Sequence, residues 1–340
     1  MKFDTAMLTS NLGDVATFTQ AAEAIGFDGV WTAEASNDPL LPLTLVAEHS
    51  STMSLGTAIA VAFPRSPMTL AMMSWDLARF SNGRFILGLG TQIKAHNERR
   101  FGVKWEKPVR KLRETIEAMH AIWDCWQNGT KLNYKGEFFN LNLMTPFFTG
   151  GPIPTRRPPV FISAVNRNML RLAGRLCDGV HIHSFHTLKY LEEFALPELE
   201  VGLADKGRTR ADIVINTMPF VVPTDDVKPA AYHEQFAKGQ IAFYMSTPAY
   251  RVVIELHGWN ETAWKLTKMV RRGEWDEMPN LITDEMLDAF ALSGTWAELP
   301  GKVHERYGGI LDRVSYYTPF VPGENDEGWA ASIAGFRALA

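Results

Sequence analysis

One short turn recurs along this chain and constrains its fold more than any other feature. It reads Asp28-Gly29-Val30 and again Asp178-Gly179-Val180, and a relative of it reads Asp312-Arg313-Val314. Each copy follows a segment with helical periodicity and precedes a short apolar run that is typical of a buried strand. A turn that recurs between helix and strand indicates a repeated βα unit.

Residues 159–184 (PVFISAVNRNMLRLAGRLCDGVHIHS) contain one complete unit. Residues 160–162 form a continuous apolar run, which suits a parallel strand buried on both faces. Apolar residues then recur with helical spacing after Asn166, a typical N-cap residue. The backbone N–H groups at the start of such a helix attract anions. Residues 163–166 are therefore a candidate phosphate site, although most βα loops look similar.

Eight strands can be counted along the chain, most of them separated by helices. They are expected at residues 3–8, 29–31, 55–61, 84–90, 160–162, 180–183, 213–222 and 313–318. This pattern predicts an α/β fold, a (β/α)8 TIM barrel in one domain over residues 1–340, with insertions after the fourth and seventh strands. A doubly wound sheet would need a Gly-rich fingerprint after the first strand, and residues 8–13 do not contain one.

Both insertions are rich in aromatic residues. Residues 129–158 are expected to form a hairpin and a surface excursion whose phenylalanines are too apolar to leave in water: Phe138, Phe139, Phe147 and Phe148. The helical insertion before the last strand carries a second aromatic group: Tyr244, Tyr250, Trp259, Trp264 and Trp275. Such a group is typical of a core or an oligomer contact, and a substrate wall is the alternative.

Composition excludes several classes of function. The chain has 340 residues, of which 46% are hydrophobic and 21% charged, as in ordinary soluble globular proteins. Its net charge is −4 and it has no long basic run, so nucleic acid is not an expected partner. Cys125 and Cys177 lie in apolar helical patterns and are expected to be buried free thiols. With no leader segment and no apolar run long enough to span a membrane, we expect a cytoplasmic protein.

In a TIM barrel the functional residues follow the carboxyl ends of the strands. This rule selects residues on six of the eight strands: Thr9, Glu34, residues 60–65, residues 91–96, residues 163–166 and His183. Glycines 88 and 90 near the end of the fourth strand indicate the close approach of another backbone or a ligand. The sequence His181-Ile182-His183 is a weak metal signal without supporting carboxylates, so no metal is expected.

Four segments together resemble the bacterial luciferase-like family of flavin and deazaflavin oxidoreductases. They are AEAIGFDGVWTAE (residues 22–34), GTAIAVAFPRSP (56–67), SNGRFILGLGTQ (81–92) and residues 159–184, which run over nearly the whole chain in the family's order. The segment GLGTQIKAHNERRFG and the aromatic insertion are most similar to the subgroup that uses the deazaflavin coenzyme F420. The same superfamily also contains FMN-dependent monooxygenases.

The resemblance implies a set of cofactor-binding residues. The cofactor phosphate would lie on the backbone N–H groups of Ala164, Val165 and Asn166. The bulge in the third strand, which often holds a non-proline cis peptide against the ring, would fall at Ala58-Ile59 and continue to Val61. Gly90 and Thr91 would lie beside the ring.

The chain departs from the family after the second strand. Many deazaflavin members have an Asp-His pair there, and the His assists proton transfer. Here the pair reads Glu34-Ala35, so the usual imidazole is missing. The remaining candidate proton donors are Glu34, Lys94 and His96. His96 is preferred because histidine titrates near neutral pH, and Glu34 is expected to hold the cofactor instead.

Three functions follow from the resemblance. The first is hydride transfer between F420 and a small, largely apolar organic substrate, with the barrel orienting the cofactor. The alternative is an FMN-dependent monooxygenase that receives reduced flavin from a reductase partner. The third is a protein that binds the cofactor without turnover. A homo-oligomer is expected in each case.

Overall fold

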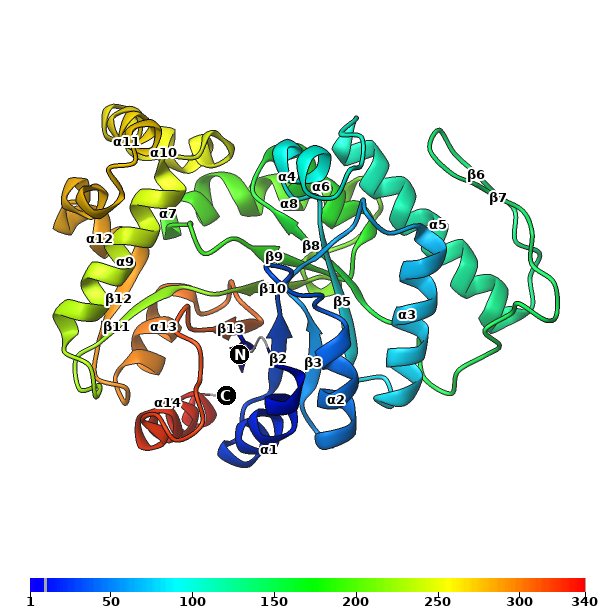
Figure 1. Cartoon of the computed structure of the whole chain (residues 1–340), viewed down its shortest axis with the longest axis horizontal. Helices are drawn as coiled ribbons and strands as arrows, with labels where there is room; N and C mark the ends of the chain where they lie inside the picture. The colour runs from blue at the N-terminus through cyan, green and yellow to red at the C-terminus, as the bar shows by residue number, and fades with distance from the viewer. Residues whose placement is uncertain (9–10, 340) are drawn as a thin grey trace.

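The computed structural model describes residues 1–8 and 11–339, so the candidate residue Thr9 lies outside the described residues. Eight strand positions pair in parallel in the order β1, β2, β3, β5, β8, β9, β10 and β13, and β13 pairs back to β1. This closed barrel confirms the predicted (β/α)8 fold (Figure 1). Its strands are β1 (Lys2–Met7), β2 (Gly29–Thr32), β3 (Ser54–Thr57), β5 (Phe85–Gly90), β8 (Val160–Ala164), β9 (Gly179–Ile182), β10 (Val214–Thr217) and β13 (Arg313–Ser315).

Two of the expected strands are interrupted. The third is divided at Ala58 and Ile59, after which β4 (Ala60–Val61) pairs with the end of β5. The expectation of one strand over residues 213–222 is wrong. Pro219 has no N–H to donate to a ladder, and beyond it β11 (Phe220–Pro223) leaves the barrel to pair in parallel with β12 (Ala291–Gly294).

The recurring aspartate has the same role in all three turns. Each carboxylate accepts a hydrogen bond from the backbone N–H at the start of a neighbouring strand: Phe3 to Asp28 at 2.8 Å, Val160 to Asp178 at 2.8 Å and Ile215 to Asp312 at 2.7 Å. The N–H group of each aspartate in turn donates to the carbonyl of that same residue. The aspartates therefore fix the amino ends of adjacent strands, which explains why the turn repeats.

Helices surround the barrel, as expected for βα repeats. Ser66 caps α3 by accepting from the Thr69 N–H at 3.1 Å, and Pro67 is the first helical residue, both as predicted. The helices packed around the barrel are α1 (Val15–Ile25), α2 (Leu41–His49), α3 (Pro67–Phe80), α5 (Pro108–Asn128), α6 (Arg167–Leu176), α8 (Leu196–Ala204), α13 (Leu299–Tyr307) and α14 (Asp326–Ala338), with the short α7 (Leu188–Tyr190) between α6 and α8. Among the described residues, no helix combines the length and apolar character needed to cross a membrane.

The two insertions project on opposite sides of the barrel (Figure 1). The first includes α4 (Lys94–Arg99) and the hairpin β6 (Tyr134–Lys135) and β7 (Asn140–Leu141). The second includes α9 (Ala230–Met245), α10 (Arg251–His257), α11 (Asn260–Arg272) and α12 (Asp284–Phe290). The expectation that Phe147 and Phe148 are buried is wrong, because their exposed fractions are 88% and 69%. Within the described part of the chain both rings thus remain largely uncovered. The expected homo-oligomer remains a prediction.

The barrel interior combines a small apolar cluster with one buried ion pair. Trp31, Ile86 and Phe161 pack together inside. Arg313 donates two hydrogen bonds to Asp4, each 2.7 Å long, and the Asp4 side chain is fully buried. This pair joins the last strand to the first. Cys125 and Cys177 are buried free thiols, as predicted.

Candidate active site

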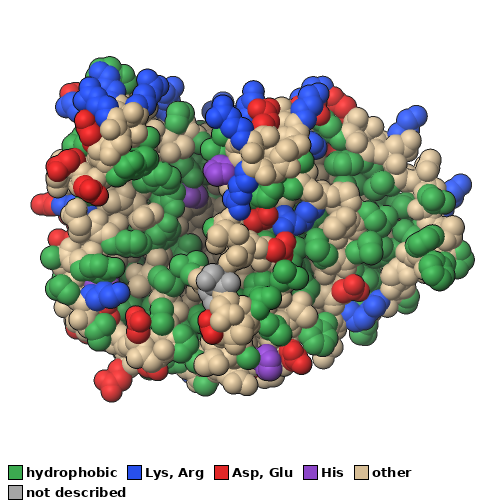
Figure 2. Space-filling view, in the orientation of Figure 1, with side chains coloured by type: hydrophobic (Ala, Val, Ile, Leu, Met, Phe, Trp, Pro, Cys, Tyr) green, Lys and Arg blue, Asp and Glu red, His purple; other side chains and the backbone are tan. Residues whose placement is uncertain are grey.

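A cavity of about 1270 Å³ opens at the carboxyl ends of the strands. Figure 2 shows this hollow, with a histidine side chain visible inside it. The loops after the barrel strands form one side, and α9 with the segment that follows it forms the other. Of the residues predicted to bind the cofactor or to donate a proton, six line the cavity: Glu34, Ala58, Ile59, Thr91, Val165 and Asn166. His183, which the carboxyl-end rule also selected, lines it as well. The cavity thus lies where the carboxyl-end rule predicts a site.

The break in the third strand forms part of the cavity wall. The Ala58-Ile59 peptide is cis, as the family resemblance predicted. The Ala58 N–H donates to the Thr32 carbonyl at 2.7 Å, and the Ile59 carbonyl accepts from the Glu34 N–H at 3.1 Å. These bonds hold the bulge between β2 and β5 and present both residues to the cavity.

Two predicted cofactor contacts lie behind the bulge instead of lining the cavity. Val61 is fully buried and is paired with Gly90. A Cβ atom on Gly90 would lie 2.6 Å from the Ile59 side chain and 2.8 Å from the Ser163 hydroxyl. Gly90 therefore leaves room for the bulge itself. Gly88 leaves room for the backbone of the neighbouring strand, since a Cβ on Gly88 would lie 1.8 Å from the Thr57 carbonyl oxygen.

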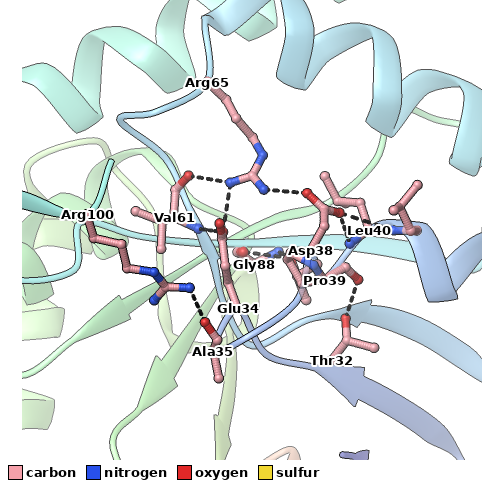
Figure 3. Close-up of polar contacts among 12 residues, drawn as sticks. Thr32, Glu34, Ala35, Asp38, Pro39, Leu40, Val61, Arg65, Gly88 and Arg100 are labelled. Atoms are coloured by element: carbon pink, nitrogen blue, oxygen red, sulfur yellow. Dashed lines mark hydrogen bonds and ion pairs between the residues drawn. The ribbon is translucent and has the colours of Figure 1, made fainter. Parts of the chain in front are cut away.

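Glu34 is the centre of an ion-pair network (Figure 3). Its Oε2 accepts from the Val61 N–H at 2.6 Å and from Arg65 Nη1 at 2.7 Å, and its side chain is only 6% exposed. Arg65 also donates to Asp38 at 2.6 Å. Burial by itself would raise the pKa of Asp38, but the hydrogen bonds from Arg65 and the Leu40 and Leu41 N–H groups lower it overall. Glu34 thus holds the bulge in place, and its oxygen is occupied by protein donors.

The structure does not bring Lys94 and His96 to the cavity. Residues 94–99 form the helix α4, and both side chains are exposed on it. The buried residue of α4 is Asn97, whose Nδ2 donates to the Thr91 carbonyl at 2.8 Å. Because residues two apart on a helix point in different directions, anchoring through Asn97 leaves both neighbours outside the cavity wall, where Lys94 pairs with Glu98 at 3.9 Å.

The turn between β8 and α6 presents the start of a helix to the cavity. Ala164 is buried, while Val165 and Asn166 line the wall. The Asn166 side chain does not cap the helix and donates instead to the Ala249 carbonyl at 3.1 Å. The Met169 N–H donates to the Asn166 carbonyl at 2.9 Å, whereas the N–H groups of Arg167 and Asn168 have no acceptor among the described residues. They form a cradle that suits a phosphate group.

The second insertion adds polar aromatic residues to the cavity. From the sequence, a substrate wall was only the alternative to a core or an oligomer contact. Tyr244 and Tyr250 line the cavity beside His183, with ring centroids 4.6 Å from the imidazole in both cases. Trp264 and Trp275 are instead largely exposed, at 60% and 49%. The aromatic content of the insertion signalled this wall, but the sequence did not show which aromatics face inward.

His181 lies on β9 and His183 directly follows this strand, and the two histidines have separate surroundings. His181 lies inside the barrel, where its Nδ1 accepts from Asn216 Nδ2 at 2.9 Å and its ring packs on Trp31 at 5.0 Å. His183 accepts at Nδ1 from the Phe185 N–H at 3.0 Å. Burial lowers the pKa of each histidine to about 3, so both are neutral near pH 7. Among the described residues, no three histidine, cysteine or carboxylate side chains gather as a possible metal site.

Comparison with known proteins relates this site to a family. The model of the luciferase-like monooxygenase family matches residues 1–313. An uncharacterised protein of Mycobacterium tuberculosis is 45% identical over 331 residues, covering 97% of this chain and 96% of that protein. A 5,10-methylenetetrahydromethanopterin reductase of Archaeoglobus fulgidus is 30% identical over 314 residues, covering 90% of this chain and 89% of that enzyme.

A solved structure agrees at the level of the fold. The coenzyme F420 dependent tetrahydromethanopterin reductase from Methanopyrus kandleri superposes with a TM-score of 0.76 at 22% identity, covering 98% of this chain and 97% of that one. The family match extends over most of the chain and includes the strand-three bulge and the turn before α6. The chain therefore belongs to the luciferase-like monooxygenase family and is a luciferase-like flavin or deazaflavin oxidoreductase.

Proposed function

We propose that this protein transfers a hydride between coenzyme F420 and a small, largely apolar organic substrate. One observation carries the proposal: a single cavity joins an anion cradle and a backbone bulge on one side to an aromatic wall on the other. Such a cavity can hold a phosphate-bearing cofactor and a second molecule together. The reductases of A. fulgidus and M. kandleri support a reducing role, and the second is described as coenzyme F420 dependent.

The chain's own residues fit the cofactor at two points. The open N-terminus of α6, preceded by Val165 and Asn166, would hold the phosphate through backbone N–H groups and the helix dipole. Ala58 and Ile59 would support one face of the ring, kept in place by Glu34. When bound, the deazaflavin supplies hydride chemistry, while the barrel orients the ring and excludes water.

The aromatic wall supports the substrate class. Tyr244, Tyr250 and Phe236 face the cavity from the second insertion, so a ligand opposite the bulge would contact three rings, two of which carry a hydroxyl. Aromatic side chains give a large apolar contact area and, in tyrosine, one hydrogen-bonding group. A small molecule with one or two polar atoms suits this wall better than a strongly charged one.

Cofactor titration tests the proposal. We expect purified protein to bind reduced F420 more tightly than reduced FMN under anaerobic conditions, and to cause no oxygen uptake beyond the autoxidation of free reduced FMN. Preference for reduced FMN, with an oxygenated product formed from an organic substrate when a flavin reductase is added and none with the reductase alone, would establish the monooxygenase alternative. Tight F420 binding without transfer to any tested acceptor would leave a cofactor-binding protein without turnover.

A backbone variant tests the phosphate cradle directly. Val165→Pro removes one N–H group and should weaken F420 binding by about 1–3 kcal/mol. Val165→Ala keeps the N–H group and is the matched control, with an expected loss below about 0.5 kcal/mol. Isothermal titration measures both, and circular dichroism checks the fold. Unchanged affinity in a folded Val165→Pro variant would place the phosphate elsewhere.

A further inference from the structure

The tyrosine hydroxyls along the aromatic wall differ in where their protons are directed. Tyr317 donates to Gln240 Oε1 at 3.1 Å, and Tyr244 lies 2.6 Å from the Tyr317 oxygen. A hydroxyl has one proton. Because Tyr317 uses its proton toward Gln240, Tyr244 must be the donor in the pair of tyrosines. Both protons are therefore committed within the protein.

Tyr250 has the opposite arrangement, which His183 imposes. Nδ1 of His183 accepts from the Phe185 backbone N–H at 3.0 Å, so this nitrogen carries no proton. The proton of the neutral ring is then on Nε2, which lies 3.0 Å from the Tyr250 oxygen. The imidazole is the donor and Tyr250 the acceptor. Among the described residues no acceptor for the Tyr250 proton is present, so this proton can point into the cavity.

The electrostatics keep both groups in these states. Burial, with a smaller contribution from His186, lowers the pKa of His183 to about 3. Burial, with a smaller contribution from Tyr244, raises the pKa of Tyr250 above its usual value. Near neutral pH the imidazole is therefore neutral and the phenol is protonated. Tyr250 is a hydrogen-bond donor held in a fixed orientation at the cavity wall.

We propose that Tyr250 is the catalytic acid of the hydride transfer, and that its substrates are carbonyl compounds or imines, whose oxygen or nitrogen accepts the Tyr250 proton. His183 is a positioning residue that acts through Tyr250. The inference rests on the proposed function and names its substrate class. Other candidate acids are less suited: Glu34 is held by Arg65, and Lys94 and His96 lie outside the cavity wall.

The step balances without a further reactant. When bound, the reduced deazaflavin would supply the hydride, with its C–H bond broken and its ring left oxidised. The hydride would bond to the carbonyl carbon while the π electrons of the C=O bond move to oxygen. The Tyr250 O–H bond breaks, its proton bonds to that oxygen, and a phenolate remains. The His183 Nε2–H group stabilises this phenolate until solvent returns a proton. The transfer is favourable because an alkoxide is more basic than a phenolate, even where burial raises the pKa of Tyr250.

The first test needs no ligand. ¹⁵N NMR of histidine-labelled protein reports the tautomer of His183, which is assigned from the signal missing in His183→Gln. We expect a neutral ring with the proton on Nε2 near neutral pH, in wild type and in Tyr250→Phe. A proton on Nδ1 alone would make Nε2 an acceptor and reverse the hydrogen bond with Tyr250. Protons on both nitrogens would contradict the neutral ring, and either result would overturn the inference.

The second test measures single-turnover hydride transfer with reduced F420 and three probes: cyclohexanone, benzaldehyde and 1-pyrroline. In Tyr250→Phe we expect transfer to slow by about 10²–10⁴-fold and the solvent deuterium isotope effect to disappear. The dissociation constant of oxidised F420 should change less than about twofold, because Tyr250 donates to the substrate and not to the phosphate cradle. Removal of a merely structural residue would not produce this combination.

Matched variants separate positioning from packing. His183→Gln retains an N–H donor for Tyr250, whereas His183→Leu does not, so the glutamine variant should keep about tenfold more activity. Tyr244→Phe removes a committed hydroxyl beside the same imidazole. It should leave the solvent isotope effect in place.

The outcomes distinguish this inference from the proposed function. Failure to bind reduced F420 would overturn both. If the protein binds F420 but the rate of hydride transfer in Tyr250→Phe stays within about threefold of wild type, only the role of Tyr250 is overturned. F420 binding followed by transfer to an activated alkene such as 2-cyclohexenone at its C=C bond, with none of the three probes reduced, would overturn the substrate class.

Discussion

Single residues of the repeated turn explain how the barrel interior is filled. A Cβ on Gly29 would lie 2.5 Å from Arg313 Nη2, and a Cβ on Gly179 would lie 2.4 Å from the Phe161 ring. Both glycines therefore leave space for a large side chain from another strand. In the third copy of the turn this position is Arg313 itself, which fills the space beside Gly29. The third copy thus has arginine in place of glycine, and this arginine occupies the space that the glycine of the first copy leaves.

Gly179→Ala should destabilise the protein by about 1–3 kcal/mol, because the added methyl group overlaps the buried Phe161 ring. Urea unfolding measures the change. Gly301→Ala is the matched control: it lies in α13 with no atom near the added Cβ, so helix propensity should stabilise by up to about 1 kcal/mol. Equal midpoints for the two variants would contradict the steric argument.

At the scale of elements, Glu23 joins α1 to the segment before β3. Its carboxylate accepts from the N–H groups of Ser51 at 2.8 Å, Thr52 at 2.7 Å and Met53 at 3.3 Å. Burial would raise the pKa of Glu23, but these hydrogen bonds outweigh it and lower the pKa from 4.5 to about 2. The folded state therefore favours the charged carboxylate.

This shift predicts a pH dependence of stability. A group whose pKa is lower in the folded state stabilises the protein fully above its unfolded pKa and loses this effect as the pH falls through the folded pKa. Glu23→Gln should therefore cost about 1 kcal/mol near neutral pH, with the difference from wild type shrinking between about pH 4.5 and pH 2. Urea unfolding at several pH values tests this, and a difference that grows on acidification would refute it.

At the scale of the whole molecule, the Asp4–Arg313 pair joins strands that are 309 positions apart in the sequence. Arg313→Met leaves the Asp4 carboxylate buried, and among the described residues the Trp31 indole N–H, at 2.9 Å, is the donor that remains. We expect a loss of about 3–5 kcal/mol in unfolding free energy. Lys265→Met, which removes an exposed pair with Glu261, should cost less than about 1 kcal/mol. Similar losses in both variants would show that barrel closure does not depend on the buried pair.

The sequence by itself determined the barrel, because its signals are local. Apolar runs, helical spacing, the Ser66-Pro67 cap and the aspartate turn each lie within a few neighbouring residues, and all agree on one repeated unit. The family resemblance added the cis bulge at Ala58-Ile59 and the family itself. The sequence did not predict the break in the strand at Pro219, because the residues on both sides of this proline have strand-like character.

Only the tertiary structure decided which side chains share the cavity. Glu34 meets Arg65, and His183 meets Tyr250, across 31 and 67 positions of sequence. Neither pair has a local signal, because partners are set by how the bulge and the second insertion pack on the barrel. Lys94 and His96 face outward for the same reason: the buried contact of Asn97 fixes the rotation of α4. Periodicity shows that a helix has an inward face, whereas only packing decides what that face contacts.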